Sequence, residues 1–401
     1  MADIFIGRQP IFDQNMNVFA YELLFRNDGK SSDARVIDGD SATSQVLMNC
    51  FVDIGLENLV GSNKAFINLT KTFLSNPDLI LLAPADQLVL EVLEDIEPTD
   101  EIINALTLLK KRGFTIALDD FIYDSKFDPF IVISDIIKID ITALNNEEII
   151  KHVKKLKSYN LKLLAEKVET YEEFEFLKEL NFDYFQGYFF SKPKVITAKS
   201  ISPNQLAVLN LVARVNDPEV EVDELSKIIS TDVSLSHKVL KFINSPVSGL
   251  RTKVDSIQQA VVLLGLSTIK NWVTIMALAA GSTKPVELGT TALVRARCCE
   301  LLGKSMGLAK PDSFFTVGLF SSLDAMMDQP LDVLLKELPL SEDSMSALLE
   351  QKGIFGEALN CTLSMERNDF GLVSFGELGL TELSDIYLQA IHWADGLSDS
   401  F

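Results

Sequence analysis

The sequence has few of the residues that build disulfide frameworks and soft-metal sites. It contains 4 cysteines and 3 histidines in 401 residues, and Cys50, Cys298, Cys299 and Cys361 show no metal-ligand spacing. Cys298 and Cys299 are adjacent within a helical pattern, where a disulfide between neighbours is not expected. This cysteine usage fits a reducing compartment, and we expect a cytoplasmic protein.

Positive charge and long apolar runs are scarce as well. The chain has 36 Lys and Arg against 57 Asp and Glu, a formal net charge of −21, which argues against nucleic acid or an anionic membrane as the main partner. The longest apolar zone, 260–280, contains Ser267, Thr268, Lys270 and Asn271, so it predicts two buried helices and no membrane span. The first residues lack a basic segment followed by an apolar run, so no signal peptide is expected.

The first half of the chain alternates strand and helix patterns. Strands are expected at 3–12, 18–25, 65–69, 88–93, 114–121, 136–141, 162–168 and 184–190, the first two as a hairpin. Helices are expected at 41–54, from 70, and at 99–111, 147–158 and 171–180. This alternation predicts parallel strands with helices outside, and a closed (β/α) barrel is the natural architecture.

Strand patterns disappear after residue 193. Residues 194–204 resemble a linker in composition, and helical patterns follow at 205–215, 222–230, 234–244, 254–265, 268–280, 289–307, 313–327 and 383–393. A length of 401 residues exceeds one typical domain. We therefore predict an α/β barrel domain at 1–193, a linker at 194–204 and an all-α domain at 205–401.

Polar residues gather within the predicted strands or at their carboxyl ends, which meet on one face of a barrel. They are Glu22, Asn68, Glu91, Glu94, Asp119, Asp120, Lys138, Asp140, Glu166, Glu169 and Gln186. Each alone is more often a cap or a solvated rim residue. Together they form an oxygen-rich set without His or Cys, which favours Mg²⁺ or Mn²⁺ over zinc. A pair of such ions can activate water against a phosphodiester.

At this point the residues resemble a known family, the EAL domain of cyclic di-GMP phosphodiesterases. The resemblance rests on short motifs in the family's order: QPI at 9–11, ELLFR at 22–26, NLT at 68–70, LEVLE at 90–94, DDF at 119–121, KID at 138–140, AEKVE at 165–169, QGY at 186–188 and SKP at 191–193. It implies a (β/α)₈ barrel of the TIM type that linearises cyclic di-GMP to pGpG.

The resemblance also implies roles. Glu22, Asn68, Glu91 and Asp119 would hold one metal ion, and Asp119, Asp120 and Glu166 a second. Lys138 would stabilise the attacking hydroxide, with Glu166 also in the catalytic set, and Gln186 would orient water with Glu169 in support. Gln9, Arg26 and Asp140 would face the substrate, Arg26 at a phosphate.

Two departures from the EAL pattern bear on activity. The family's glycine-containing loop after DDF is replaced by Ile-Tyr-Asp-Ser-Lys-Phe at 122–127, which cannot follow the same backbone path. Lys167 replaces the glycine of AEGVE, next to a proposed metal ligand.

The second half resembles the HDOD domain, a helical relative of HD-type phosphohydrolases. The match lies in 216–218, 225–230, 234–240, 243–245 and 259–266. Where a catalytic relative has a His-Asp metal pair, this chain has Ser321 and Ser322, so no hydrolase chemistry is expected there. His237 and His392 are expected to be packing or surface residues.

The domain order resembles the YuxH-like EAL–HDOD signalling proteins, linked to cyclic di-GMP, motility and biofilms. Two hypotheses stay open. The barrel hydrolyses cyclic di-GMP with two metal ions, under control of the HDOD half, or it is an inactive receptor or partner-binding scaffold. The resemblance implies a protein partner at the HDOD half, and homodimerisation is a further alternative.

Overall fold

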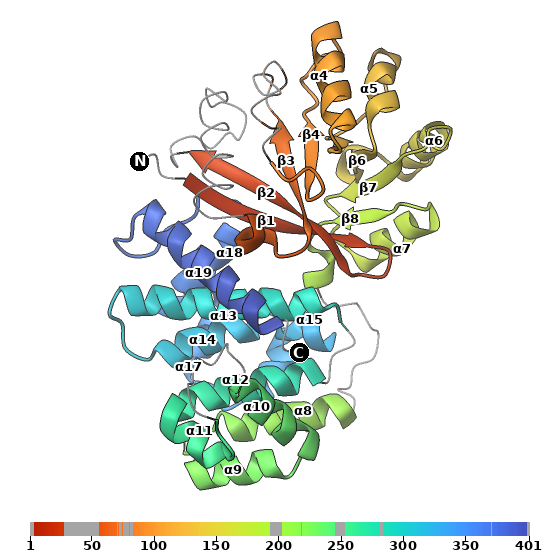
Figure 1. Cartoon of the computed structure of the whole chain (residues 1–401). Helices are drawn as coiled ribbons and strands as arrows, with labels where there is room; N and C mark the ends of the chain where they lie inside the picture. The colour runs from red at the N-terminus through yellow and green to blue at the C-terminus, as the bar shows by residue number, and fades with distance from the viewer. Residues whose placement is uncertain are drawn as a thin grey trace. The chain divides into compact units, whose positions relative to one another are not determined.

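The computed structural model describes residues 4–27, 56–69, 71, 74, 80, 83–192, 203–217, 219–244, 253–280, 284–369 and 371–398. The helix expected at 41–54 and most of the one expected from residue 70 lie outside these ranges, as does linker segment 194–202. The chain divides into two compact units (Figure 1). One comprises residues 1–190, 364–374 and 379–388, and the other residues 191–363, 375–378 and 389–401. The predicted domain boundaries stay predictions.

The first unit is built on a closed barrel of strands β1 to β8. The strands are β1 (Ile4–Asp13), β2 (Val18–Asn27), β3 (Lys64–Leu69), β4 (Leu88–Val92), β5 (Thr115–Leu118), β6 (Ile136–Asp140), β7 (Lys162–Glu166) and β8 (Tyr184–Gln186). From β2 to β8 neighbouring strands are parallel, whereas β1 is antiparallel to both β2 and β8. The predicted barrel is confirmed, and its first strand runs against the others because β1 and β2 form a hairpin.

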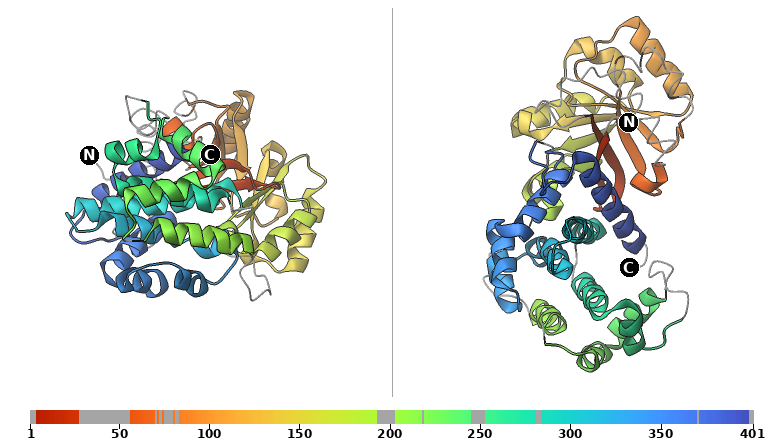
Figure 2. Two further views of the ribbon diagram at one scale, coloured as in Figure 1. Left: turned by 90° about the horizontal axis from the view of Figure 1, so that it is seen from below. Right: turned by 90° about the vertical axis from the view of Figure 1, so that its left-hand side faces the viewer.

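Helices cover the outer side of the parallel strands (Figure 1, Figure 2). They are α2 (Leu56–Val60), α4 (Asp100–Lys111), α5 (Asp128–Ile133), α6 (Asn146–Leu156) and α7 (Tyr171–Glu179). Local sequence sets where α6 begins, because the Asn145 side chain accepts from the Glu148 amide while Glu148 accepts from the Asn145 amide. Ile149, Val153 and Leu156 then share the buried face.

The barrel interior holds one apolar layer to which almost every strand contributes. Its buried members are Ile11, Ala20, Phe66, Val89, Ala117, Ile136 and Leu164, with Tyr184 of β8 packed against them. Alternate residues of a strand point to the same side. The residues two positions further toward the carboxyl ends of the parallel strands therefore form the next layer of the interior.

The second unit is helical. Its helices are α8 (Pro203–Val215), α9 (Val222–Ser230), α10 (Val233–Ile243), α11 (Ile257–Leu264), α12 (Leu266–Ala280), α13 (Val286–Ser305), α14 (Pro311–Phe320), α15 (Leu323–Met327), α16 (Leu331–Leu334) and α17 (Glu342–Glu350). Two more, α18 (Gly353–Glu366) and α19 (Leu380–Ser398), contribute residues to both units. The all-α expectation is confirmed, but the helix predicted at 313–327 is two helices, and α16 to α18 were not predicted. No described helix is long and apolar enough to cross a membrane.

Candidate functional site

On each parallel strand, the predicted polar residue stands two positions after the residue that belongs to the apolar layer. Glu22 follows Ala20, Asn68 follows Phe66, and the same step leads to Glu91, Asp119, Lys138, Glu166 and Gln186. Gln9 precedes Ile11 by two residues, which places it in the same layer because β1 runs in the opposite direction. The strand register agrees, since Gln9 pairs with Glu22, and Asn68 pairs with Glu91. The barrel therefore gathers these side chains above its apolar layer.

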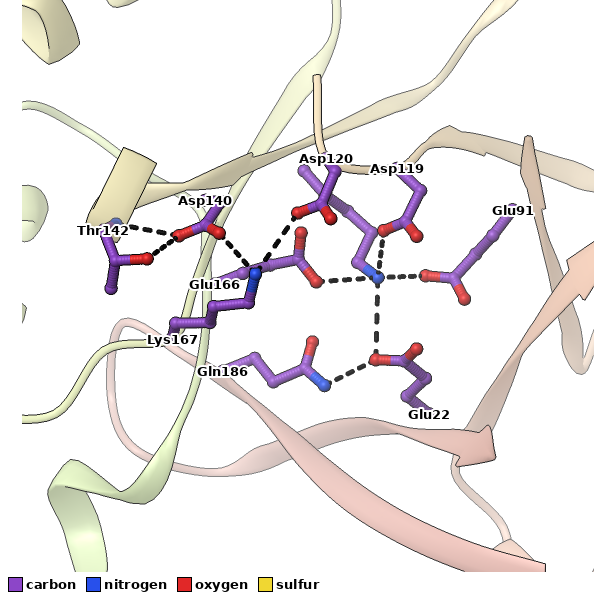
Figure 3. Close-up of polar contacts among 10 residues, drawn as sticks. Glu22, Glu91, Asp119, Asp120, Asp140, Thr142, Glu166, Lys167 and Gln186 are labelled. Carbon is purple, nitrogen blue, oxygen red and sulfur yellow. Dashed lines mark hydrogen bonds and ion pairs between the residues drawn. The ribbon is translucent and has the colours of Figure 1, made fainter. Parts of the chain in front are cut away.

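The Lys138 ammonium lies among four carboxylates of this polar layer, those of Glu22, Glu91, Asp119 and Glu166, which Figure 3 labels. Its Nζ is 2.5 Å from Oε1 of Glu91, 2.7 Å from Oδ1 of Asp119 and 2.9 Å from Oε1 of Glu166. A fourth carboxylate oxygen, Oε2 of Glu22, lies 3.5 Å away. The Lys138 side chain is 0% exposed, so it offsets charges that water does not screen.

Burial and mutual repulsion change the protonation of the acids around Lys138. Burial, reinforced by the charges of Glu22 and Asp119, raises the pKa of Glu91 well above its usual range, and Lys138 only partly opposes this. Burial likewise raises the pKa of Glu166 to about 8. For Lys138, burial favours the neutral amine, but the surrounding carboxylates outweigh it and raise the lysine pKa. These pKa shifts favour the ammonium form of Lys138 and the protonated forms of Glu91 and Glu166.

Gln186 links β8, the last strand of the barrel, to β1 and β2 through side-chain hydrogen bonds. Its Nε2 donates to Oε2 of Glu22 at 2.6 Å and to Oε1 of Gln9 at 3.0 Å. Gln9 in turn donates through Nε2 to the Tyr188 hydroxyl at 3.1 Å, and that hydroxyl donates to the Glu366 carbonyl at 3.0 Å within the same unit. Sequence reasoning selected Gln9 and Gln186 but missed Tyr188, although it lies in the matched QGY motif.

Gly187 allows the chain to hold Gln186 in this position. Its φ is +146°, and a Cβ there would lie 2.0 Å from the Val168 carbonyl oxygen and 2.5 Å from the Val168 nitrogen. The Val168 amide donates to the Gln186 carbonyl at 3.0 Å, and the Phe189 amide donates to the Val168 carbonyl at 3.2 Å. Only glycine tolerates both this φ and this close approach.

A second lysine lies beside a second group of carboxylates. Nζ of Lys167 contacts Oδ2 of Asp140 and is 3.7 Å from Oδ1 of Asp120 (Figure 3). Burial alone would raise the pKa of Asp140, but hydrogen bonds from Lys167 and Thr142 outweigh it and lower that pKa. Lys167 and Asp120 have left-handed backbones, with φ of 59° and 42°. The φ of Lys167 gives a physical reason for the glycine that the EAL pattern has at this position.

The donor set suits a hard divalent cation in its chemistry. Oδ1 of Asn68, Oε2 of Glu91 and Oε2 of Glu166 are buried with neither a hydrogen bond nor an ion pair. Amide and carboxylate oxygens are the ligands that Mg²⁺ and Mn²⁺ prefer. As the described side chains stand, no three Asp, Glu, His or Cys residues surround a metal position, because the carboxylates point to an ammonium. The residues fit a divalent ion in kind, and Lys138 holds them together in the structure.

Of the remaining predicted residues, the structure describes Glu169 completely and Arg26 only by its backbone. Glu169 is exposed beyond the end of β7, where its amide donates to Oε2 of Glu173 at 2.8 Å. The backbone of Arg26 pairs with Phe5 in the β1–β2 hairpin, while its side chain lies outside what the structure describes. The roles predicted for these residues and for the whole layer stay predictions.

The loop after Asp120 is held by contacts that the sequence did not indicate. The Tyr123 amide donates to Nε2 of His152 at 3.2 Å, and the Tyr123 hydroxyl donates to Asp128 at 3.0 Å. Asp124 accepts from the Lys126 amide and begins a single 3₁₀ turn, η3 (Ser125–Phe127). This glycine-free loop therefore has its own anchored path at the edge of the site.

In the helical unit, the two serines at the expected metal-pair position contact a cation. Nη1 of Arg295 donates to Oγ of Ser322 at 3.0 Å and to Oγ of Ser321 at 3.4 Å. Hydroxyls bound to a guanidinium are not a divalent-metal site. His237 and His392 are exposed, as expected for surface residues.

The comparisons with known proteins agree with both halves. Residues 45–193 match the EAL domain and residues 203–328 match the HDOD domain. The uncharacterized protein YuxH of Bacillus subtilis (strain 168) is 33% identical over 408 residues, which cover 99% of each chain. The cyclic di-GMP phosphodiesterase CdgJ of Vibrio cholerae serotype O1 is 32% identical over 407 residues, covering 99% of this chain and 94% of CdgJ.

Among solved structures, a standalone EAL protein from Vibrio cholerae O395 in its c-di-GMP-bound form is 24% identical, with a TM-score of 0.39. The match covers 50% of this chain and 97% of the chain in that structure. This chain is an EAL–HDOD two-domain protein, as the closed barrel with its acidic layer, the helical unit and the two domain matches show. The chain belongs to the YuxH-like EAL–HDOD family, to which its full-length similarity to YuxH and CdgJ assigns it.

Proposed function

We propose that the barrel hydrolyses cyclic di-GMP to pGpG with divalent metal ions, Mg²⁺ or Mn²⁺. The observation that carries this proposal is the convergence of Glu22, Glu91, Asp119 and Glu166 on Lys138. Four acids drawn together in a barrel interior serve no purpose in packing, since their repulsion and desolvation oppose folding. The family membership and the activity named for CdgJ supply the substrate class.

The residues of this chain have separate tasks in such a reaction. Glu22, Asn68, Glu91 and Asp119 would hold one ion, and Asp119, Asp120 and Glu166 are the set for a second. A divalent ion supplies charge for the phosphodiester and lowers the pKa of bound water. Lys138, held as an ammonium, stabilises negative charge that develops beside Asp119 and Glu166. Glu166, whose pKa is about 8, can hold or release a proton near neutral pH.

Gln186 and Gln9 orient the edge of the site near Glu22. Because Gln186 gives its amide hydrogens to Glu22 and Gln9, its own Oε1 is left to accept from water or substrate. Gln9, Arg26 and Asp140 are proposed to contact the substrate, and Glu169 to support Gln186. The HDOD half is proposed as a regulatory or protein-interaction module.

A second candidate is a cyclic di-GMP receptor or partner-binding scaffold without turnover. The observation that favours it is that Lys138 and Lys167 already offset the acids without metal. Under this alternative the barrel binds the nucleotide or a partner, and the helical half transmits its state.

The test uses purified full-length protein with cyclic di-GMP and Mg²⁺ or Mn²⁺, and measures pGpG by chromatography. We expect product from the wild type and none from Glu22→Ala. Glu147→Ala, on the exposed first turn of α6, is the matched control and should retain activity. Absence of product from wild type at high protein concentration would exclude hydrolysis. Calorimetry with the nucleotide then separates a receptor from a scaffold.

A further inference from the structure

Lys167 occupies a backbone position that disfavours it. Its φ of 59° lies in the left-handed region, where a side chain with a Cβ is strained and glycine is not. The residue directly follows Glu166 at the end of β7. A strained residue beside a reactive site points to a role in that site.

A residue that is not in the proposed set of metal ligands holds the Lys167 side chain in place. Its Nζ contacts Oδ2 of Asp140, which is not in that set. Asp140 is fixed in turn, because its Oδ1 accepts from the Thr142 amide at 2.8 Å and from the Thr142 hydroxyl at 2.7 Å. The lysine anchor therefore does not depend on whether a metal ion is bound.

From this anchor, the ammonium reaches Asp120, one of the carboxylates proposed for the second ion. Its Nζ is 3.7 Å from Oδ1 of Asp120, and Figure 3 shows the ammonium in contact with both Asp140 and Asp120. A divalent cation bound to Asp120 would lie close to this fixed positive charge. The Lys167 side chain is 53% exposed and that of Asp120 34%, so water screens part of the repulsion between two such like charges, but does not remove it at this distance.

We propose that the Lys167 ammonium takes the place of the second divalent ion, so that the barrel binds one Mn²⁺ or Mg²⁺ per chain. This inference rests on the proposed metal site. The first ion keeps donors that neither lysine contacts, because Oδ1 of Asn68 and Oε2 of Glu91 are buried without a hydrogen bond or an ion pair. The chain would thus use one metal ion and one built-in cation at the acidic layer.

The test is the number of Mn²⁺ ions bound per chain by metal-free, full-length protein, from the electron paramagnetic resonance signal of free Mn²⁺. We expect one ion for the wild type and two for Lys167→Asn and Lys167→Gly. Asparagine and glycine both tolerate the left-handed backbone, so these variants remove the charge without adding strain. At Mn²⁺ concentrations that fill one site in the wild type, the second site of these variants should fill as well, because removing the charge raises its affinity about 10- to 100-fold, the scale of a close charge–charge repulsion.

Two further variants separate charge from position. Lys167→Arg keeps the cation and should keep a stoichiometry of one. Lys162→Asn removes an exposed lysine at the other end of β7, where Nζ of Lys162 is 2.6 Å from Oδ1 of Asp183, and should also leave one.

The possible failures are distinguishable. Two ions bound by wild type, or one ion bound by Lys167→Asn and Lys167→Gly, would overturn this inference and leave the proposed hydrolysis standing. If neither the wild type nor any variant binds Mn²⁺, the metal site of the proposed function is itself wrong, and the inference falls with it.

Discussion

The amide of Gln186 donates to the Glu22 carboxylate at 2.6 Å and thereby links the last strand of the barrel to the second. In sequence the two residues are 164 positions apart. Glu22 is 6% exposed, so water cannot readily replace this donor. Loss of the donor costs more free energy when the buried acceptor is charged than when it is neutral.

We expect Gln186→Ala to reduce hydrolysis of cyclic di-GMP by about 10- to 100-fold, because a hydrogen bond to a charged group contributes about 1.5–3 kcal/mol. The measurement is kcat and KM in the presence of Mn²⁺. The control is Gln14→Ala, which removes a single hydrogen bond of a partly buried glutamine outside the acidic layer, from Nε2 to the Phe182 carbonyl at 2.7 Å. Equal losses in both variants would show that Gln186 acts only through stability.

The sequence was enough to predict the layer that holds Gln186. Alternating apolar residues mark the strands, and parallel strands bring their carboxyl ends to one face, so residues such as Glu91 and Glu166 had to converge. The sequence pattern did not predict which residue lies at the centre of this layer. Lys138 was expected as one residue among several, and its position between four carboxylates depends on strand register and barrel closure.

Other features depend on contacts that local sequence does not contain. The helix predicted across 313–327 breaks at Ser321 and Ser322 without glycine or proline, where both hydroxyls bind Arg295 of α13. The loop at 122–127 is anchored by His152 of α6, a residue distant in sequence. Lys167 could be singled out as a replacement for glycine, but its contact with Asp140 required the structure.

Replacing Lys138 tests whether its charge holds the acidic layer together. Lys138→Met should lower the free energy of unfolding of the metal-free protein by about 3–5 kcal/mol, because it leaves buried carboxylates without their cation. Chemical denaturation in the presence of a chelator measures this. Saturating Mn²⁺ should restore part of the loss, since an ion bound only by the folded chain stabilises it.

The control for this prediction is Lys110→Met. Nζ of Lys110 lies 3.1 Å from Oδ1 of Asp135, with both side chains more than a third exposed, and such pairs contribute about 0–1 kcal/mol. A comparable loss in the two variants, or no effect of Mn²⁺ on Lys138→Met, would contradict the cationic role of Lys138.

Gly187 offers a test of the backbone at the end of β8. Gly187→Ala would place a Cβ 2.0 Å from the Val168 carbonyl oxygen, and we expect a loss of about 2–4 kcal/mol from this overlap and the strained φ. Gly61→Ala is the control, because Gly61 also has a positive φ but nothing lies within 4 Å of its added Cβ. That variant should lose about 1 kcal/mol from strain alone, and melting temperatures of both would show the difference.

The raised pKa of Glu166 predicts how stability depends on pH. The unfolded chain ionises this carboxyl near its ordinary value of 4.5, whereas the folded chain keeps the proton until about pH 8. Unfolding therefore releases a proton between these values. The stabilisation is complete below about pH 4.5 and is lost as the pH rises through about 8.

Metal-free wild type should lose stability relative to Glu166→Gln across this window, at no more than about 1.4 kcal/mol per pH unit. Glutamine keeps the shape of the protonated acid but does not titrate, so its stability should lack this slope. Denaturation curves at several pH values between 5 and 8.5 measure the difference, with the exposed Glu97→Gln as a control that should follow wild type. Parallel curves for wild type and Glu166→Gln would mean that Glu166 is ionised in the folded barrel, and that Lys138 neutralises it more completely than its buried surroundings oppose its charge.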